Sequence, residues 1–323
     1  MNAANTRKKS WLDRRLVGIP LLVWLAIIMA LSGAVVLFYP VFSTDWNNRV
    51  QREVAQEYSR LVNHDAEDTR RERLDRAREF NTKINGNPVL EPTLSQWAKK
   101  TDTYKEYLTV LDDPAEVMAL LKIPKIGVEL PIYHGTDQIT LDRGLGHMYG
   151  SDLPVGGVGE GEGRHAVITG HTGLPSATML DHLTKLVIGD QFFIEVQGEV
   201  LSYRVDQIEI VNPNDPRLLH RFKNHDYLTL LTCTPYGVNS HRLLVRGERV
   251  LPPPQKIPEV GKGMRSWWMT WFTIGMIACL AVVAWMLLLT LLGSRRRKDE
   301  EDETVDEPSD GYAAEDLKLR FSS

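Results

Sequence analysis

Two long apolar segments, one towards each end of the chain, most constrain what this sequence can fold into. Residues 16–42 and 267–292 carry no charged side chain and are rich in Leu, Ile, Val and Ala. A helix of about 20 apolar residues crosses a hydrocarbon layer about 30 Å thick, so each segment predicts a transmembrane helix. A cleaved signal peptide is the alternative for the first segment, but such peptides have apolar regions of only about 7–15 residues. We therefore expect an uncleaved signal anchor at residues 16–42.

Basic residues beside the two segments predict how the chain is oriented. Arg14 and Arg15 close a basic stretch before the first segment, and a run of four basic residues at 295–298 follows the second. The positive-inside rule then predicts a multi-pass protein of the cell membrane. Residues 1–15 and 293–323 would lie in the cytoplasm, and residues 43–266 outside. The acidic run at 299–303 and the polar residues after it predict a disordered tail.

The outer part of the chain, residues 43–266, is long enough for one well-buried core. A formal net charge of -4 gives no broad basic surface, which argues against a nucleic-acid partner. Its first part, residues 43–118, is predicted to be a helical entry. Within it, residues 46–61 have apolar side chains at every third or fourth position, and residues 65–76 are densely charged with both signs, as on a solvated helix face.

From residue 119 the pattern changes to short β-rich runs separated by Gly, Pro and Asn. The runs are residues 121–123, 128–133, 165–169, 191–196, 201–205, 227–233 and 242–246. Seven or more short strands at this spacing predict a mainly β body at residues 119–252, folded as a barrel or a sandwich. Closure into a barrel would remove exposed strand edges. Residues 253–266 would link this body to the second apolar segment.

Cys233 is the only cysteine outside the apolar segments, because Cys279 falls within the second one. The two therefore cannot pair. Extracytoplasmic domains normally use their cysteines in disulfides, so a single unpaired one predicts a reactive thiol.

A cation and a base accompany this thiol in the predicted strands. The runs 227–233 and 242–246 read as neighbouring strands, and antiparallel pairing would bring Cys233 close to Arg242. A guanidinium there would favour the thiolate and could donate to a developing oxyanion. His171 directly follows the run 165–169, and it could transfer protons if that strand lies near Cys233. Cys233, His171 and Arg242 together predict nucleophilic catalysis.

Each of these residues also has a purely structural interpretation. Cys233 could be an inert buried side chain, His171 a hydrogen-bonded loop histidine, and Arg242 half of a surface ion pair worth at most about 1 kcal/mol. Four other histidines are expected to be structural: His134, His147, His165 and His241. The chain has no CxxC or HxxxH spacing, which disfavours a zinc site. We expect neither a metal nor a cofactor.

The ordered motifs resemble those of the sortases, the membrane-anchored cysteine transpeptidases of Gram-positive bacteria, and most closely the class C, pilus-assembling branch. Residues 229–233 (Thr-Leu-Leu-Thr-Cys) match the T-L-x-T-C element of that family, and residues 234–242 match its continuation. Thr-Gly-His-Thr-Gly at 169–173 is similar to its histidine loop. Residues 123–135 and 144–148 are similar to upstream segments of the class C branch. The resemblance covers about residues 120–250.

This resemblance implies an eight-stranded β-barrel and a defined reaction. Cys233 would attack the Thr–Gly carbonyl of an LPxTG-like sorting signal, with His171 as acid and then base and Arg242 at the oxyanion. A lysine amine of a second pilin would then resolve the thioacyl enzyme. The alternatives are a housekeeping sortase that anchors surface proteins to the cell-wall precursor lipid II, a cysteine endopeptidase, and a non-catalytic membrane-tethered binding domain.

Class C sortases usually carry a lid, in which an Asp-Pro-aromatic tripeptide covers the cysteine. The nearest candidate here is Glu91-Pro92 with Trp97 nearby, which departs from that pattern. Alternatively, Pro92 occupies the first turn of a helix that contains Trp97, a position that proline favours.

Overall fold

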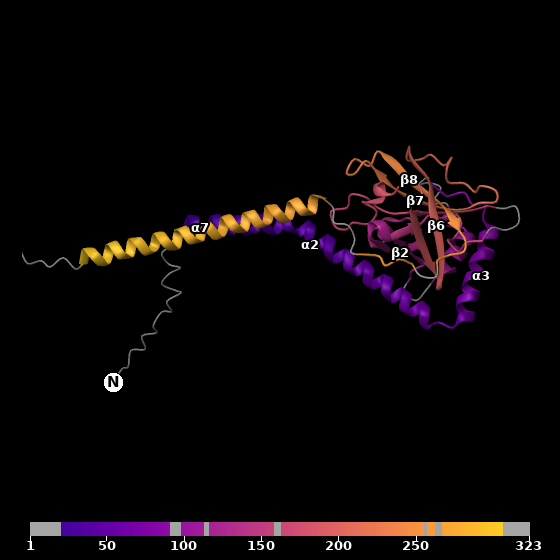
Figure 1. Ribbon diagram of the computed structural model, residues 1–323, viewed down its shortest axis with the longest axis horizontal. Helices are drawn as coiled ribbons and strands as arrows, with labels where there is room; N and C mark the ends of the chain where they lie inside the picture. The colour runs from indigo at the N-terminus through magenta and orange to yellow at the C-terminus, as the bar shows by residue number, and fades with distance from the viewer. Residues whose placement is uncertain are drawn as a thin grey trace, which may run out of the picture. The chain divides into compact units, whose positions relative to one another are not determined.

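The structure is a computed structural model, and it describes residues 21–90, 98–112, 116–157, 163–254, 257–261 and 267–305 (Figure 1). The chain divides into two compact units. One is Pro40–Thr270, and the other combines Met1–Tyr39 with Trp271–Ser323.

Both apolar segments are helical where they are described. The first lies in α2 (Leu21–His64) and the second in α7 (Trp267–Val305), and both helices are long and apolar enough to cross a membrane. The predicted helix at residues 46–61 is not separate, because α2 continues through Pro40 without a break. The prediction of disorder from residue 299 is wrong for its first part, since α7 extends to Val305.

Two further helices complete the entry to the barrel. α3 (Glu67–Lys83) has the predicted solvated face, where Arg71 pairs with Glu67, and it buries Leu74, Ala77 and Phe80 on its other side. α5 (Asp102–Thr109) is capped at its N-terminus by Thr101, whose hydroxyl accepts a hydrogen bond from the backbone N–H of Tyr104. This helix buries Tyr104 and Tyr107, which contact one another with ring centroids 5.6 Å apart.

Eight strands close into a barrel, as the family resemblance implied and in place of the alternative sandwich. The order around the barrel is β1-β2-β3-β4-β7-β8-β6-β5. Short helical turns, η1 (Pro124–Ile126) and η2 (Leu183–Lys185), and helix α6 (Gln138–Arg143) lie in the connections. The strands are β1 (Ala119–Ile123), β2 (Val128–His134), β3 (Leu145–His147), β4 (Arg164–Thr169), β5 (Gln191–Val196), β6 (Glu199–Val211), β7 (Asp226–Thr234) and β8 (His241–Val250).

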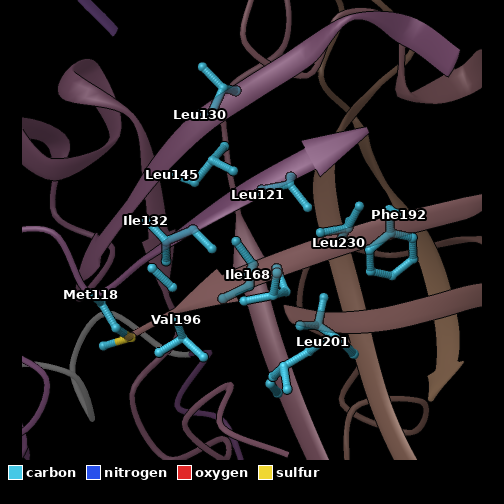
Figure 2. Packing of buried hydrophobic residues seen from close by; sticks show 14 of the residues in the cluster. Met118, Leu121, Leu130, Ile132, Leu145, Ile168, Phe192, Val196, Leu201 and Leu230 are labelled. Atoms are coloured by element: carbon cyan, nitrogen blue, oxygen red, sulfur yellow. The ribbon is translucent and has the colours of Figure 1, made fainter. Parts of the chain in front are cut away.

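Inward-pointing side chains of these strands fill the barrel. Ile168 of β4 and Leu228 and Leu230 of β7 belong to this main cluster. Figure 2 shows Ile168, Leu230 and Leu201 converging with side chains from the other strands. A second cluster uses the alternate residues of the same strands, Val167 and Leu231, together with Met148, Leu219 and Leu244. Because successive side chains of a strand point to opposite faces, this second cluster lies on the outer face of the barrel.

Two buried histidines have the structural role expected of them. The ring of His147 is bonded to the Tyr107 hydroxyl and to the Asp152 carbonyl. The ring of His165 is bonded to the His220 carbonyl and to the Thr229 hydroxyl. Burial lowers the pKa of each imidazole to about 4, so both are neutral near pH 7.

Candidate active site

Strand β7 carries Cys233 between two neighbours that supply the other predicted site residues. β7 is parallel to β4, and the last pair in that register is Thr169 with Leu231. Two residues further along, His171 therefore reaches the level of Cys233. On the other side, antiparallel pairing with β8 sets Cys233 directly opposite Arg242. All three residues thus meet at one end of three adjacent strands.

The alternation of the strands also brings the three residues to one face. Val167 and Leu231 point to the outer face, and Leu244 of β8 joins them there. Cys233 is two residues from Leu231 and Arg242 is two residues from Leu244, so both share that face. His171 continues the same alternation two residues past Thr169, just beyond the end of β4.

Hydrogen bonds from Thr232 hold the histidine loop against β7. The Thr232 hydroxyl donates to the Gly170 carbonyl at 2.7 Å and lies 2.8 Å from the Thr172 hydroxyl. The backbone N–H of Gly170 donates to the Leu231 carbonyl at 3.1 Å. The residues on both sides of His171 are therefore tied to the strand that carries Cys233.

Helix α6 contacts the imidazole, which the sequence patterns did not predict. Nε2 of His171 lies 3.9 Å from Oδ1 of Asp142 and 3.5 Å from the Gln138 side-chain nitrogen. Gln138 also donates to Asp142 at 2.7 Å. The Asp142 carboxylate therefore faces the ring of His171. One signal was present in the sequence: Gln138 and Asp142 are four residues apart, the spacing that puts two side chains on one helix face.

Arg242 uses part of its guanidinium to hold the β7–β8 loop. Its Nη1 donates to the carbonyls of Asn239 and His241, at 3.2 and 3.1 Å. Within the described ranges no hydrogen bond joins Cys233 to His171 or to Arg242. Cys233 is partly exposed. A guanidinium has five N–H donors, and two bonds from Nη1 leave others for a substrate oxygen.

The predicted lid residues Glu91, Pro92 and Trp97 lie outside the described residues. The lid stays a prediction.

Comparisons with known proteins agree with this geometry. Residues 121–250 match the Sortase domain family. Sortase A from Corynebacterium diphtheriae is similar in structure, with 47% identity, a TM-score of 0.55, and coverage of 66% of this chain and 99% of that chain. Sortase C-1 from Actinomyces oris has 46% identity and a TM-score of 0.52, and the match covers 56% of this chain and 98% of that chain. Sortase D of Bacillus subtilis is 29% identical over 153 residues, which are 46% of this chain and 72% of the relative. The chain belongs to the sortase family of cysteine transpeptidases.

Proposed function

We propose that this chain is a pilus-assembling, class C sortase that joins a sorting signal to a lysine of a pilin. Cys233 is the nucleophile, His171 the general acid and base, and Arg242 the oxyanion donor. The observation that supports these roles is that the three residues share one face at the end of adjacent strands β4, β7 and β8. A nucleophile, a proton carrier and a cation in that arrangement are the parts that acyl transfer needs.

The first half-reaction forms a thioester. The Cys233 thiolate attacks the threonine carbonyl of an LPxTG-like signal, and the carbonyl oxygen becomes an oxyanion beside Arg242. When this tetrahedral intermediate collapses, the Thr–Gly bond breaks and protonated His171 gives its proton to the departing glycine amine. Asp142 of α6 faces the imidazole that makes this transfer.

The second half-reaction transfers the acyl group. The amine of a pilin lysine attacks the thioester carbonyl, neutral His171 takes a proton from that amine, and the Cys233 thiolate leaves. The product is an isopeptide bond, and the thiolate–imidazolium pair is restored for the next cycle. Because one imidazole acts in both halves, its proton is conserved over the cycle.

The choice of the pilus branch rests on the organisation of the chain. Identities of 46% and 47% to a sortase C-1 and a sortase A favour neither branch. The second apolar helix, followed by a basic run, supports the pilus branch and a topology with both termini in the cytoplasm. In this proposal residues 119–252 are the catalytic barrel and residues 43–118 its helical entry.

The acceptor can be tested with the full-length protein in detergent. A donor protein that carries both an LPxTG signal and surface lysines is supplied together with lipid II. We expect a ladder of covalent multimers on a denaturing gel, and no ladder when the donor lysines have been dimethylated. A single donor–lipid II species would contradict the pilus assignment in favour of a housekeeping sortase. Release of hydrolysed donor alone would indicate an endopeptidase.

A further inference from the structure

The first residues of α2 beyond the apolar segment contact the loop that follows His171. The Thr44 hydroxyl donates to the Pro175 carbonyl at 3.0 Å, and the Asn47 amide donates to the Ser176 carbonyl at 2.8 Å. Asn48 exchanges two hydrogen bonds with Thr178. The same loop is bonded back to the site, because the N–H of Leu180 donates to the His171 carbonyl at 3.1 Å.

These contacts lie close to the expected membrane surface. The apolar segment ends at Phe42, so Thr44 and Asn48 lie only about 3–9 Å further along the helix at 1.5 Å per residue. The polar region on each side of the hydrocarbon layer is about 5–8 Å thick. Trp46 is 58% exposed and stacks on Phe42, as interfacial aromatic side chains do. The loop at residues 175–178 is therefore level with the lipid headgroups.

The second apolar helix reaches the other loop of the site. Burial raises the pKa of the Tyr236 hydroxyl in the β7–β8 loop. Trp268, at the start of α7, lies close enough to this hydroxyl to offset part of that rise. The chain that leads to α7 also passes α2, because Val260 and Gly261 line a hollow together with Asn48. Both membrane-flanking helices thus contact loops that border Cys233.

The two loops touch each other and present apolar side chains. Gly173 has φ +79°, and a methyl group added there would lie 3.3 Å from the backbone nitrogen of Gly237. Val238 is 70% exposed and Tyr236 is 43% exposed. The β7–β8 loop at residues 235–240 has no acidic residue that anionic lipid would repel. Water is an unfavourable environment for this apolar surface, and the nearby bilayer is a favourable one.

We propose that the β7–β8 loop docks on the outer surface of the bilayer that holds α2 and α7, with Tyr236 and Val238 among the lipid headgroups. The catalytic end of the barrel then faces the membrane. Cys233 then lies close to the outer surface of that bilayer. This inference rests on membrane anchoring by the two helices and is independent of the pilus assignment.

The test is quenching of a fluorophore by spin-labelled lipid. Full-length protein with Cys233→Ala and Cys279→Ala receives a single cysteine by Val238→Cys, carries an environment-sensitive fluorophore there, and is reconstituted into phosphatidylcholine–phosphatidylglycerol vesicles. We expect headgroup-labelled lipid to reduce the fluorescence about twofold or more. The matched control is Lys223→Cys, an exposed position at the opposite end of β7. That end is about 30 Å away at roughly 3.3 Å per residue, so its fluorescence should be unchanged.

Two results would overturn the inference. Protein that fails to float with the vesicles on a density gradient would remove the anchoring on which the inference rests. Protein that floats, but whose fluorophores at positions 238 and 223 are quenched equally, would show that the catalytic end of the barrel does not face the bilayer. Neither result bears on the acceptor, which the ladder experiment tests separately.

Discussion

Replacing His171 with alanine is expected to lower the rate of transfer by about 10⁴-fold, the upper end of the range for general acid–base catalysis. The effect should be this large because, in the proposed mechanism, the imidazole serves both half-reactions. Without it, neither the departing glycine amine nor the incoming lysine amine has a proton partner. The measurement is the steady-state rate of isopeptide formation from an LPxTG peptide and a lysine peptide, over a range of pH.

The matched control for this variant is His225→Ala. His225 lies just before the opposite end of β7, where its ring is bonded to Glu248, so its loss should leave the rate unchanged. The His171 variant should stay folded, because the side-chain contacts that it removes, to Asp142 and Gln138, are long, at 3.9 and 3.5 Å. A fall of less than tenfold, with the pH dependence of the rate retained, would remove His171 from the proposed mechanism.

Replacing Asp152 with alanine is expected to destabilise the barrel domain by about 3–5 kcal/mol, the usual cost of removing one partner of a buried ion pair. The Asp152 side chain is 1% exposed, and Arg221 donates to both of its oxygens at 2.6 and 2.8 Å. The N–H of His165 donates to the same carboxylate at 2.8 Å. Arg221 also donates to the Asn81 carbonyl of α3 at 2.7 Å. The alanine variant leaves a largely buried guanidinium without its counterion.

This loss can be measured by thermal unfolding of the full-length protein in detergent. For a domain of this size, about 3–5 kcal/mol corresponds to a fall in Tm of roughly 10 °C. Adding Arg221→Ala to the Asp152 variant should lower the free energy of unfolding much less than Arg221→Ala does in the wild-type protein, because the two residues act as a pair. Asp75→Ala, which removes an exposed partner of Arg78, should leave the Tm unchanged. An Asp152→Ala protein that unfolds at the wild-type temperature would contradict the account of this network.

The parts of the site that depend on neighbouring strands could be predicted from the sequence. β7 and β8 follow one another along the chain, and a short loop between two β-rich runs predicts a hairpin. The pairing of Cys233 with Arg242 was therefore expected, and the register confirms it. The adjacency of β4 and β7 could only be assumed, because the sequence patterns of two strands so far apart along the chain do not show that they pair.

Features set by tertiary contacts were missed. β3 has only three residues and no alternation to reveal it, yet it joins β2 to β4 and so completes the barrel. The contact of Asp142 with His171 depends on where α6 packs, and periodicity within six residues cannot predict that. The continuity of α2 also escaped prediction, because the apolar segment to residue 42 and the amphipathic pattern at residues 46–61 were read separately, whereas they form one helix. Packing against the barrel outweighs these local signals, as the buried Ala55 and Tyr58 of α2 show.

The central claim, that Cys233 carries the acyl group, is tested most directly by the intact mass of the full-length protein after incubation with an LPxTG peptide. A mass gain equal to the acyl fragment ending at threonine, absent from the Cys233→Ala variant and reversed by hydroxylamine, is the predicted result. Hydroxylamine cleaves thioesters, so this reversal identifies the bond. An adduct of equal size on the Cys233→Ala variant, or isopeptide product formed by that variant, would contradict the claim.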